Sequence, residues 1–175
     1  MSDSVKAFIA VDLVNDFVEG KFGSARSVEV AEKAAGFLRA VKGGIIIFTR
    51  DSHIKDDPEF RVWGEHCLDG AWGSELHISL KGINGHDIKK RHFDAFYDSD
   101  LDGYLRANNV RDVFIFGIST DICVLHTAAG AFFRNYRITV IEDLCAAISD
   151  RDHEKALYDM KRNYGARMVK SEEVL

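Results

Sequence analysis

Cysteine is scarce in this chain, with three residues among 175. A small, odd number of cysteines argues against a disulfide framework and favours a reducing compartment. Long apolar runs are also missing, because no stretch approaches the roughly 20 residues that a membrane helix needs. Residues 1–6 lack the basic and apolar regions of an export signal. We therefore expect a cytoplasmic protein without a membrane partner.

Basic residues are also fewer than acidic residues. The 23 Lys and Arg residues are outnumbered by 28 Asp and Glu residues, and the formal net charge is -5. Without a basic surface the chain is not expected to bind nucleic acid, and a small molecule is the expected ligand. Residues 1–175 are long enough to bury one core, so we expect a single domain, whose 46% hydrophobic content permits a homo-oligomer.

Short apolar runs that end in polar residues alternate with stretches of helical spacing. The runs predict strands over residues 6–12, 44–53, 112–117, 137–143 and 166–170. The helical spacing predicts helices over residues 27–41, 99–108, 121–136 and 150–164. Residues 54–95 are expected to be mostly loop with short helical turns. This alternation is typical of a three-layer αβα, Rossmann-like α/β fold with a central, mostly parallel sheet.

Polar side chains follow the predicted strands where each strand ends. Asp12, Asp51 and His53 come at the ends of the first two strands, and Cys123 lies at the start of the helix after the third. Ligands bind beside the carboxyl ends of the strands in open parallel sheets. We therefore expect these four side chains to share one site.

Cys123 has two interpretations. Thr120 is a suitable N-cap, which places Cys123 in the first turn of a helix, where the positive end of the dipole lowers a thiol pKa. Alternatively, Cys123 is a packing residue, since cysteine is among the most buried residue types. Asp12 is likewise either a general base for this thiol or a cap that anchors a loop.

Asp51 and His53 form a D-x-H pair, in which side chains two residues apart in an extended segment point to the same side. His66 follows in "WGEHCLDG", and Glu59 can supply a further oxygen. Carboxylate and imidazole ligands suit Zn, Mn or Fe. The alternative is that these are unrelated polar residues of a loop.

Four sequence blocks resemble the isochorismatase-like cysteine hydrolases, and within them the nicotinamidase (pyrazinamidase) branch. In chain order the blocks are "AFIAVDLVNDF", "FTRDSH" with "WGEHCLDGAWGSEL", "KRHFDAF" and "GISTDICVLHTAAGA". The resemblance implies that three residues are catalytic, namely Asp12, Lys90 and Cys123. It also implies one divalent metal ion, zinc in the first place with Mn or Fe as alternatives, held by Asp51, His53, His66 and Glu59.

The resemblance further implies a cis peptide bond between Ile118 and Ser119, which would direct the N–H groups of Ser119 and Cys123 into one oxyanion hole. Phe17 and Trp63 would be walls of a pocket for a flat ring. The reaction that the resemblance implies is hydrolysis of nicotinamide, or of a similar small aromatic carboxamide such as pyrazinamide, to the acid and ammonia. It would proceed through a thioester acyl-enzyme on the cysteine.

Two departures from the branch keep other functions open. Ser52 stands where tryptophan is common, and Asp94 stands where serine is common. Because these positions are expected to line the substrate pocket or the metal site, they favour an amidase for another small carbamoyl or ureido compound. A third hypothesis is a non-catalytic α/β binding module, in which Cys123 would be unreactive.

Overall fold

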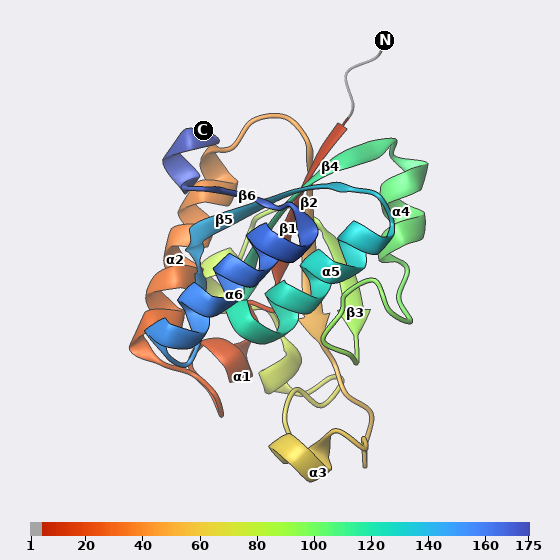
Figure 1. The fold of residues 1–175 in the computed structure, drawn as a ribbon. Helices are drawn as coiled ribbons and strands as arrows, with labels where there is room; N and C mark the ends of the chain where they lie inside the picture. The colour runs from red at the N-terminus through yellow and green to blue at the C-terminus, as the bar shows by residue number, and fades with distance from the viewer. Residues whose placement is uncertain (1–4) are drawn as a thin grey trace.

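Six strands form one parallel sheet in the computed structural model, which describes residues 5–175. The strand order is β3-β2-β1-β4-β5-β6 (Figure 1). The bounds are β1 Val5–Val11, β2 Ile45–Asp51, β3 His86–Lys90, β4 Val110–Ile118, β5 Arg137–Ala146 and β6 Arg167–Val169. Residues 1–4, part of the segment in which we expect no export signal, lie outside the described residues.

Helices cover both faces of the sheet. The α-helices are α1 Asn15–Val18, α2 Ala25–Ala40, α3 Phe60–Trp63, α4 Leu101–Ala107, α5 Leu125–Phe133 and α6 Asp150–Tyr164. From β1 the sheet continues through β2 to β3 on one side, and β4, β5 and β6 follow in order on the other side. Right-handed crossovers therefore put α2 on one face, and α5 and α6 on the opposite face (Figure 1).

Shorter helical turns join these elements. The 3₁₀ turns are η1 Trp72–Ser74, η2 Ile78–Leu80 and η4 Ser171–Glu173, and a π-helical turn, η3, spans Thr120–Val124. Among residues 5–175, no helix combines the length and the apolar content needed to cross a membrane.

Capping side chains fix where the two longest helices begin. At the start of α2, Ser24 accepts a hydrogen bond from the Ser27 N–H at 3.0 Å. Ser149 accepts one from the Asp152 N–H at 3.1 Å at the start of α6, and Gly165 ends that helix in the left-handed region.

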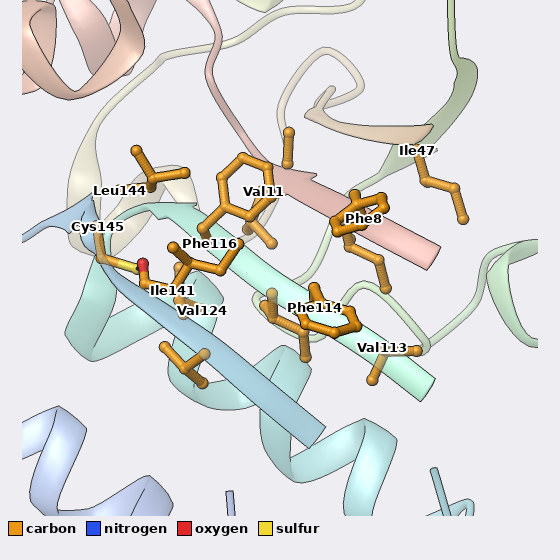
Figure 2. Packing of buried hydrophobic residues seen from close by; sticks show 14 of the residues in the cluster. Phe8, Val11, Ile47, Val113, Phe114, Phe116, Val124, Ile141, Leu144 and Cys145 are labelled. Carbon is orange, nitrogen blue, oxygen red and sulfur yellow. The ribbon is translucent and has the colours of Figure 1, made fainter. Parts of the chain in front are cut away.

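Aromatic side chains hold α2 against the middle of the sheet. The Phe8 ring on β1 lies 5.1 Å from the Phe114 ring on β4 and 5.7 Å from the Phe37 ring on α2. Phe116 contacts Phe37 at 5.7 Å, and Figure 2 shows Phe8, Phe114 and Phe116 together in this cluster. Burying one such side chain contributes about 1.5–3 kcal/mol. The cluster therefore stabilises the pairing of β1 with β4.

Gly117 brings β4 close to β1 at the end of their pairing. Its φ is +134°, which L side chains rarely adopt, and it pairs with Val11. A Cβ atom at this position would overlap the Val11 carbonyl oxygen. Only glycine fits here, and the next two residues lead directly into the turn that carries Cys123.

All five predicted strands are present, and the three-layer parallel fold is confirmed. The sixth strand, β3, lies in the segment 54–95 that was expected to be mostly loop. Its sequence "HDIKK" has one apolar residue and therefore no apolar run. The predicted helix 121–136 is wrong at its start, because the π-helical turn precedes α5 and the α-helix begins at Leu125.

Candidate active site

Four chemically active residues come together where the strand order changes direction, between β1 and β4. Asp12 directly follows β1, Asp51 is the last residue of β2, and Lys90 is the last residue of β3. Cys123 lies in the π-helical turn after β4. Each of them reaches this edge because the carboxyl ends of parallel strands lie there.

Lys90 lies at the centre of the group. Its Nζ lies 2.6 Å from Asp12 Oδ2, 3.1 Å from Asp51 Oδ1 and 3.8 Å from Cys123 Sγ. The lysine side chain has no exposed surface. One buried cation therefore contacts two carboxylates and the thiol, and it fixes their positions relative to one another.

Thr49 fixes the orientation of the Asp12 carboxylate. Its hydroxyl donates to Asp12 Oδ1 at 2.7 Å, and its carbonyl accepts from the Asp12 N–H at 3.1 Å. Oδ1 is therefore occupied, and Oδ2 faces Lys90. Sequence reasoning missed Thr49 because a threonine inside an apolar run carries no signal beyond strand propensity.

Burial controls the protonation of these groups. It raises the pKa of the Cys123 thiol well above its usual range, although Lys90 opposes the shift, and it also raises the pKa of Asp12. Burial alone would lower the pKa of Lys90, but Asp12 and Asp51 together raise it well above its usual range. The predicted lowering of the thiol pKa by a helix start is therefore wrong. Burial therefore favours a neutral thiol at Cys123 beside the Lys90 cation.

The turn before Cys123 has the expected cis peptide between Ile118 and Ser119. Ser119, not Thr120, is the N-cap residue, and its hydroxyl bonds to Asp121 Oδ1 at 2.5 Å instead of to a backbone N–H. The prediction that Thr120 caps the helix is therefore wrong. The Thr120 hydroxyl pairs with His153 Nδ1 of α6 at 2.9 Å, so it ties this turn to the neighbouring helix.

A second group of ligand-type atoms adjoins the first. His53 Nε2 lies 2.9 Å and His66 Nε2 lies 3.5 Å from Asp51 Oδ2. Glu59 Oε1 lies 4.0 Å from His53 Nε2 and 3.9 Å from His66 Nε2. Asp51 connects the two groups, since its other oxygen accepts from Lys90.

This donor set fits a divalent ion. One oxygen from Asp51 and one nitrogen each from His53 and His66 lie within 4.8 Å of one another, and all three residues are buried. Ligands at about 2.0–2.2 Å from a tetrahedral zinc ion lie at comparable mutual separations. The His66 Nδ1 is paired with the Gly64 carbonyl at 2.7 Å, which leaves Nε2 free to bind the ion.

A cavity of about 210 Å³ opens beside Cys123. The predicted walls Phe17 and Trp63 both line it, together with Phe22, which was not predicted. The Phe22 ring lies 5.2 Å from the His66 ring and 6.2 Å from the Trp63 ring. Sites for drug-sized ligands have roughly 300–1,000 Å³, so this cavity suits a smaller molecule.

Lys21 ties together the two segments that carry the aromatic walls. Its Nζ donates to the Trp63 carbonyl at 2.7 Å and to the Glu65 carbonyl at 2.9 Å. The same ammonium lies 5.1 Å from the centre of the Phe22 ring. The side chain lies outside the cavity lining, so it supports the walls without adding charge to the cavity.

Ser52 and Asp94 do not line the cavity, contrary to the expectation. The Ser52 hydroxyl donates to Asp69 Oδ1 at 2.8 Å, on the side of the chain away from Asp51. Asp94 accepts from the Phe96 N–H at 2.8 Å and stabilises its own loop. These two departures therefore do not change the wall of the cavity.

The chain is similar to known proteins along almost its whole length. The Isochorismatase domain matches residues 6–173. N-carbamoylsarcosine amidase from Thermoplasma acidophilum is 36% identical, with a TM-score of 0.87 over 97% of this chain and 98% of that chain. Nicotinamidase/pyrazinamidase PncA from Bacillus subtilis is 30% identical, with a TM-score of 0.83 over 95% and 100%. Pyrazinamidase of Pyrococcus horikoshii in complex with zinc is 29% identical, with a TM-score of 0.86 over 94% and 98%.

Proposed function

The chain belongs to the isochorismatase family, and from this premise we propose that it is a cysteine amidohydrolase for a small aromatic carboxamide. Nicotinamide is the proposed substrate, with pyrazinamide as a close analogue, and the products are the acid and ammonia. One observation carries the proposal: Asp12, Lys90 and Cys123 lie in one buried group beside an aromatic cavity. The relatives named for nicotinamide and pyrazinamide hydrolysis support the choice of substrate.

The proposed reaction begins with the neutral thiol. Asp12 accepts the proton of Cys123 as the sulfur attacks the amide carbon, and the Lys90 cation stabilises the new thiolate. The N–H groups of Ser119 and Cys123 donate to the oxyanion of the tetrahedral intermediate. The C–N bond then breaks, Asp12 returns its proton to the leaving ammonia, and a thioester remains. Water hydrolyses the thioester, which releases the acid and restores the thiol.

We propose that Asp51, His53, His66 and Glu59 hold one divalent ion, zinc in the first place. The zinc in the related pyrazinamidase supports this assignment. A bound ion supplies a Lewis acid at the cavity wall. The protein contributes the orientation of the ligands, because Lys90 holds Asp51 and the Gly64 carbonyl holds His66.

A carbamoyl compound is the second candidate substrate, because the N-carbamoylsarcosine amidase is the more similar of the named relatives in sequence. That substrate carries a carboxylate. Among the described residues that line the cavity there is no lysine and no arginine to pair with that carboxylate, whereas Phe17, Phe22 and Trp63 present aromatic rings. A neutral aromatic amide therefore suits the cavity better than an anion.

Ammonia release from nicotinamide and from N-carbamoylsarcosine by the purified protein tests the choice of substrate. We expect a higher kcat/KM for nicotinamide. A higher kcat/KM for the carbamoyl compound would overturn the substrate and leave the thiol chemistry in place.

Two cysteine variants test the chemistry itself. Cys123→Ser should lose at least about 10³-fold in kcat, since the serine hydroxyl is a far weaker nucleophile without a strong base. Cys145→Ser is the matched control, because Cys145 is also buried but lies outside the cavity lining. Equal activity in the two variants would exclude Cys123 as the nucleophile.

A further inference from the structure

Asp57 is a buried carboxylate that contacts two of the proposed metal ligands. It lies between β2 and α3, and 8% of its surface is exposed. Its Oδ2 lies 3.2 Å from His53 Nδ1, and its Oδ1 accepts from the Glu59 N–H at 3.0 Å. One side chain therefore contacts both the ring of His53 and the backbone that carries Glu59.

The two ring nitrogens of His53 face different groups. The ring is fully buried, and Nε2 faces Asp51 Oδ2 and the other ligand atoms. Nδ1 makes no well-directed hydrogen bond among the described residues, and Asp57 Oδ2 is the carboxylate oxygen that faces it. An imidazole that binds a metal through Nε2 carries its proton on Nδ1, and that proton needs an acceptor.

The two ring nitrogens of His66 are arranged in the same way, but the acceptor at Nδ1 is different. Its Nδ1 pairs with the Gly64 carbonyl, and its Nε2 faces Asp51. For His53 the acceptor is a carboxylate, which is stronger than a carbonyl. Arg91 Nη1, 3.8 Å from Asp57 Oδ2, adds a positive charge beside this carboxylate.

We propose that Asp57 is a positioning residue of the metal site, which holds the His53 proton on Nδ1 and directs the Nε2 lone pair towards the ion. The inference rests on the metal site in the proposed function but not on the choice of substrate. Through the Glu59 N–H, Asp57 also fixes the segment that brings the Glu59 carboxylate towards the two histidines.

Zinc affinity of the metal-free protein, measured by competition with a chromogenic chelator, tests this role without any substrate. Asp57→Asn should weaken zinc binding by about 10–100-fold, the usual effect of losing such a partner. Asp56→Asn is the matched control, since Asp56 is the exposed neighbour and its φ of +60° suits asparagine. A wild-type affinity in Asp57→Asn, or no zinc binding by the wild type, would overturn the proposal.

The histidine tautomer gives a readout that general loosening of the structure would not produce. In ¹⁵N spectra of the zinc-loaded wild type, His53 should carry its proton on Nδ1. Asp57→Glu keeps the charge and should recover part of the zinc affinity lost in Asp57→Asn. An affinity for Asp57→Glu no better than for Asp57→Asn would contradict the role, as would a proton on Nε2 in the wild type. A wild type that binds zinc but does not hydrolyse nicotinamide would instead count against the proposed function.

Discussion

Lys90 Nζ lies 2.6 Å from Asp12 Oδ2, and neither side chain has any surface exposed to solvent. The same ammonium is 3.1 Å from Asp51 Oδ1. One cation therefore contacts two buried carboxylates. Because buried charges are strongly destabilising when unpaired, this lysine should stabilise the fold as well as serve as a proposed catalytic residue.

Replacing Lys90 should lower the free energy of unfolding sharply. Lys90→Met keeps most of the side-chain volume but leaves the buried Asp12 carboxylate without a cation and removes one partner of Asp51, which should cost about 3–5 kcal/mol. Lys89→Met is the control, since Lys89 is exposed and forms a surface pair with Asp69, worth about 0–1 kcal/mol. Urea unfolding followed by circular dichroism measures both. Similar losses in the free energy of unfolding of the two variants would show that the buried lysine contributes no more to stability than the surface lysine.

The pH dependence of activity should reflect Asp12. Burial raises the pKa of Asp12 above its ordinary 3.8, and the proposed base must be ionised to accept the thiol proton. Activity should therefore be present above the raised pKa and be lost as the pH falls through it, at a pH above 3.8. A profile of kcat/KM against pH with nicotinamide measures this. A loss of activity centred at or below pH 3.8 in folded protein would contradict the assignment of Asp12.

Removing the Phe22 ring should weaken substrate binding more than it slows the chemistry. Phe22→Ala takes away one aromatic wall but leaves Lys90 and Cys123 in place, so KM should rise by about tenfold with a smaller change in kcat. Phe133→Ala is the control, because Phe133 is 71% exposed and lies outside the cavity lining. Steady-state kinetics with nicotinamide separate the two parameters. An unchanged KM would remove Phe22 from the binding site.

Strand ends were the most informative part of the sequence. The strands β1 and β2 end at Val11 and Asp51, within two residues of the predicted ends, and parallel pairing then requires Asp12 and Asp51 to lie at the same edge. Lys90 could not be located in this way. Its strand, β3, pairs with a single neighbour and alternates buried with exposed residues, so it has no apolar run, and only the family resemblance pointed to the lysine.

Properties that depend on tertiary packing were not predictable. The position of Cys123 near a helix start predicted a lowered thiol pKa, but burial raises it, and burial is set by segments distant in sequence. Phe22 and Asp57 lie in loops, where no periodicity indicates which way a side chain points. Their roles follow from contacts with residues that the loops bring together.

Replacing glycine by alanine should have opposite effects on stability at the edge of the site and in an ordinary helix. Gly117→Ala would put a Cβ atom into the Val11 carbonyl oxygen at a φ of +134°, so β1 and β4 must move apart beside Asp12. The expected loss in the free energy of unfolding is at least about 3 kcal/mol, with loss of activity.

Gly103→Ala is the control, because its new Cβ atom lies inside α4 and meets no atom within 4 Å. That variant should gain up to about 1 kcal/mol, because alanine favours the helix. Urea unfolding measures both, and a well-folded, active Gly117→Ala protein would mean that β1 and β4 do not approach as closely as described.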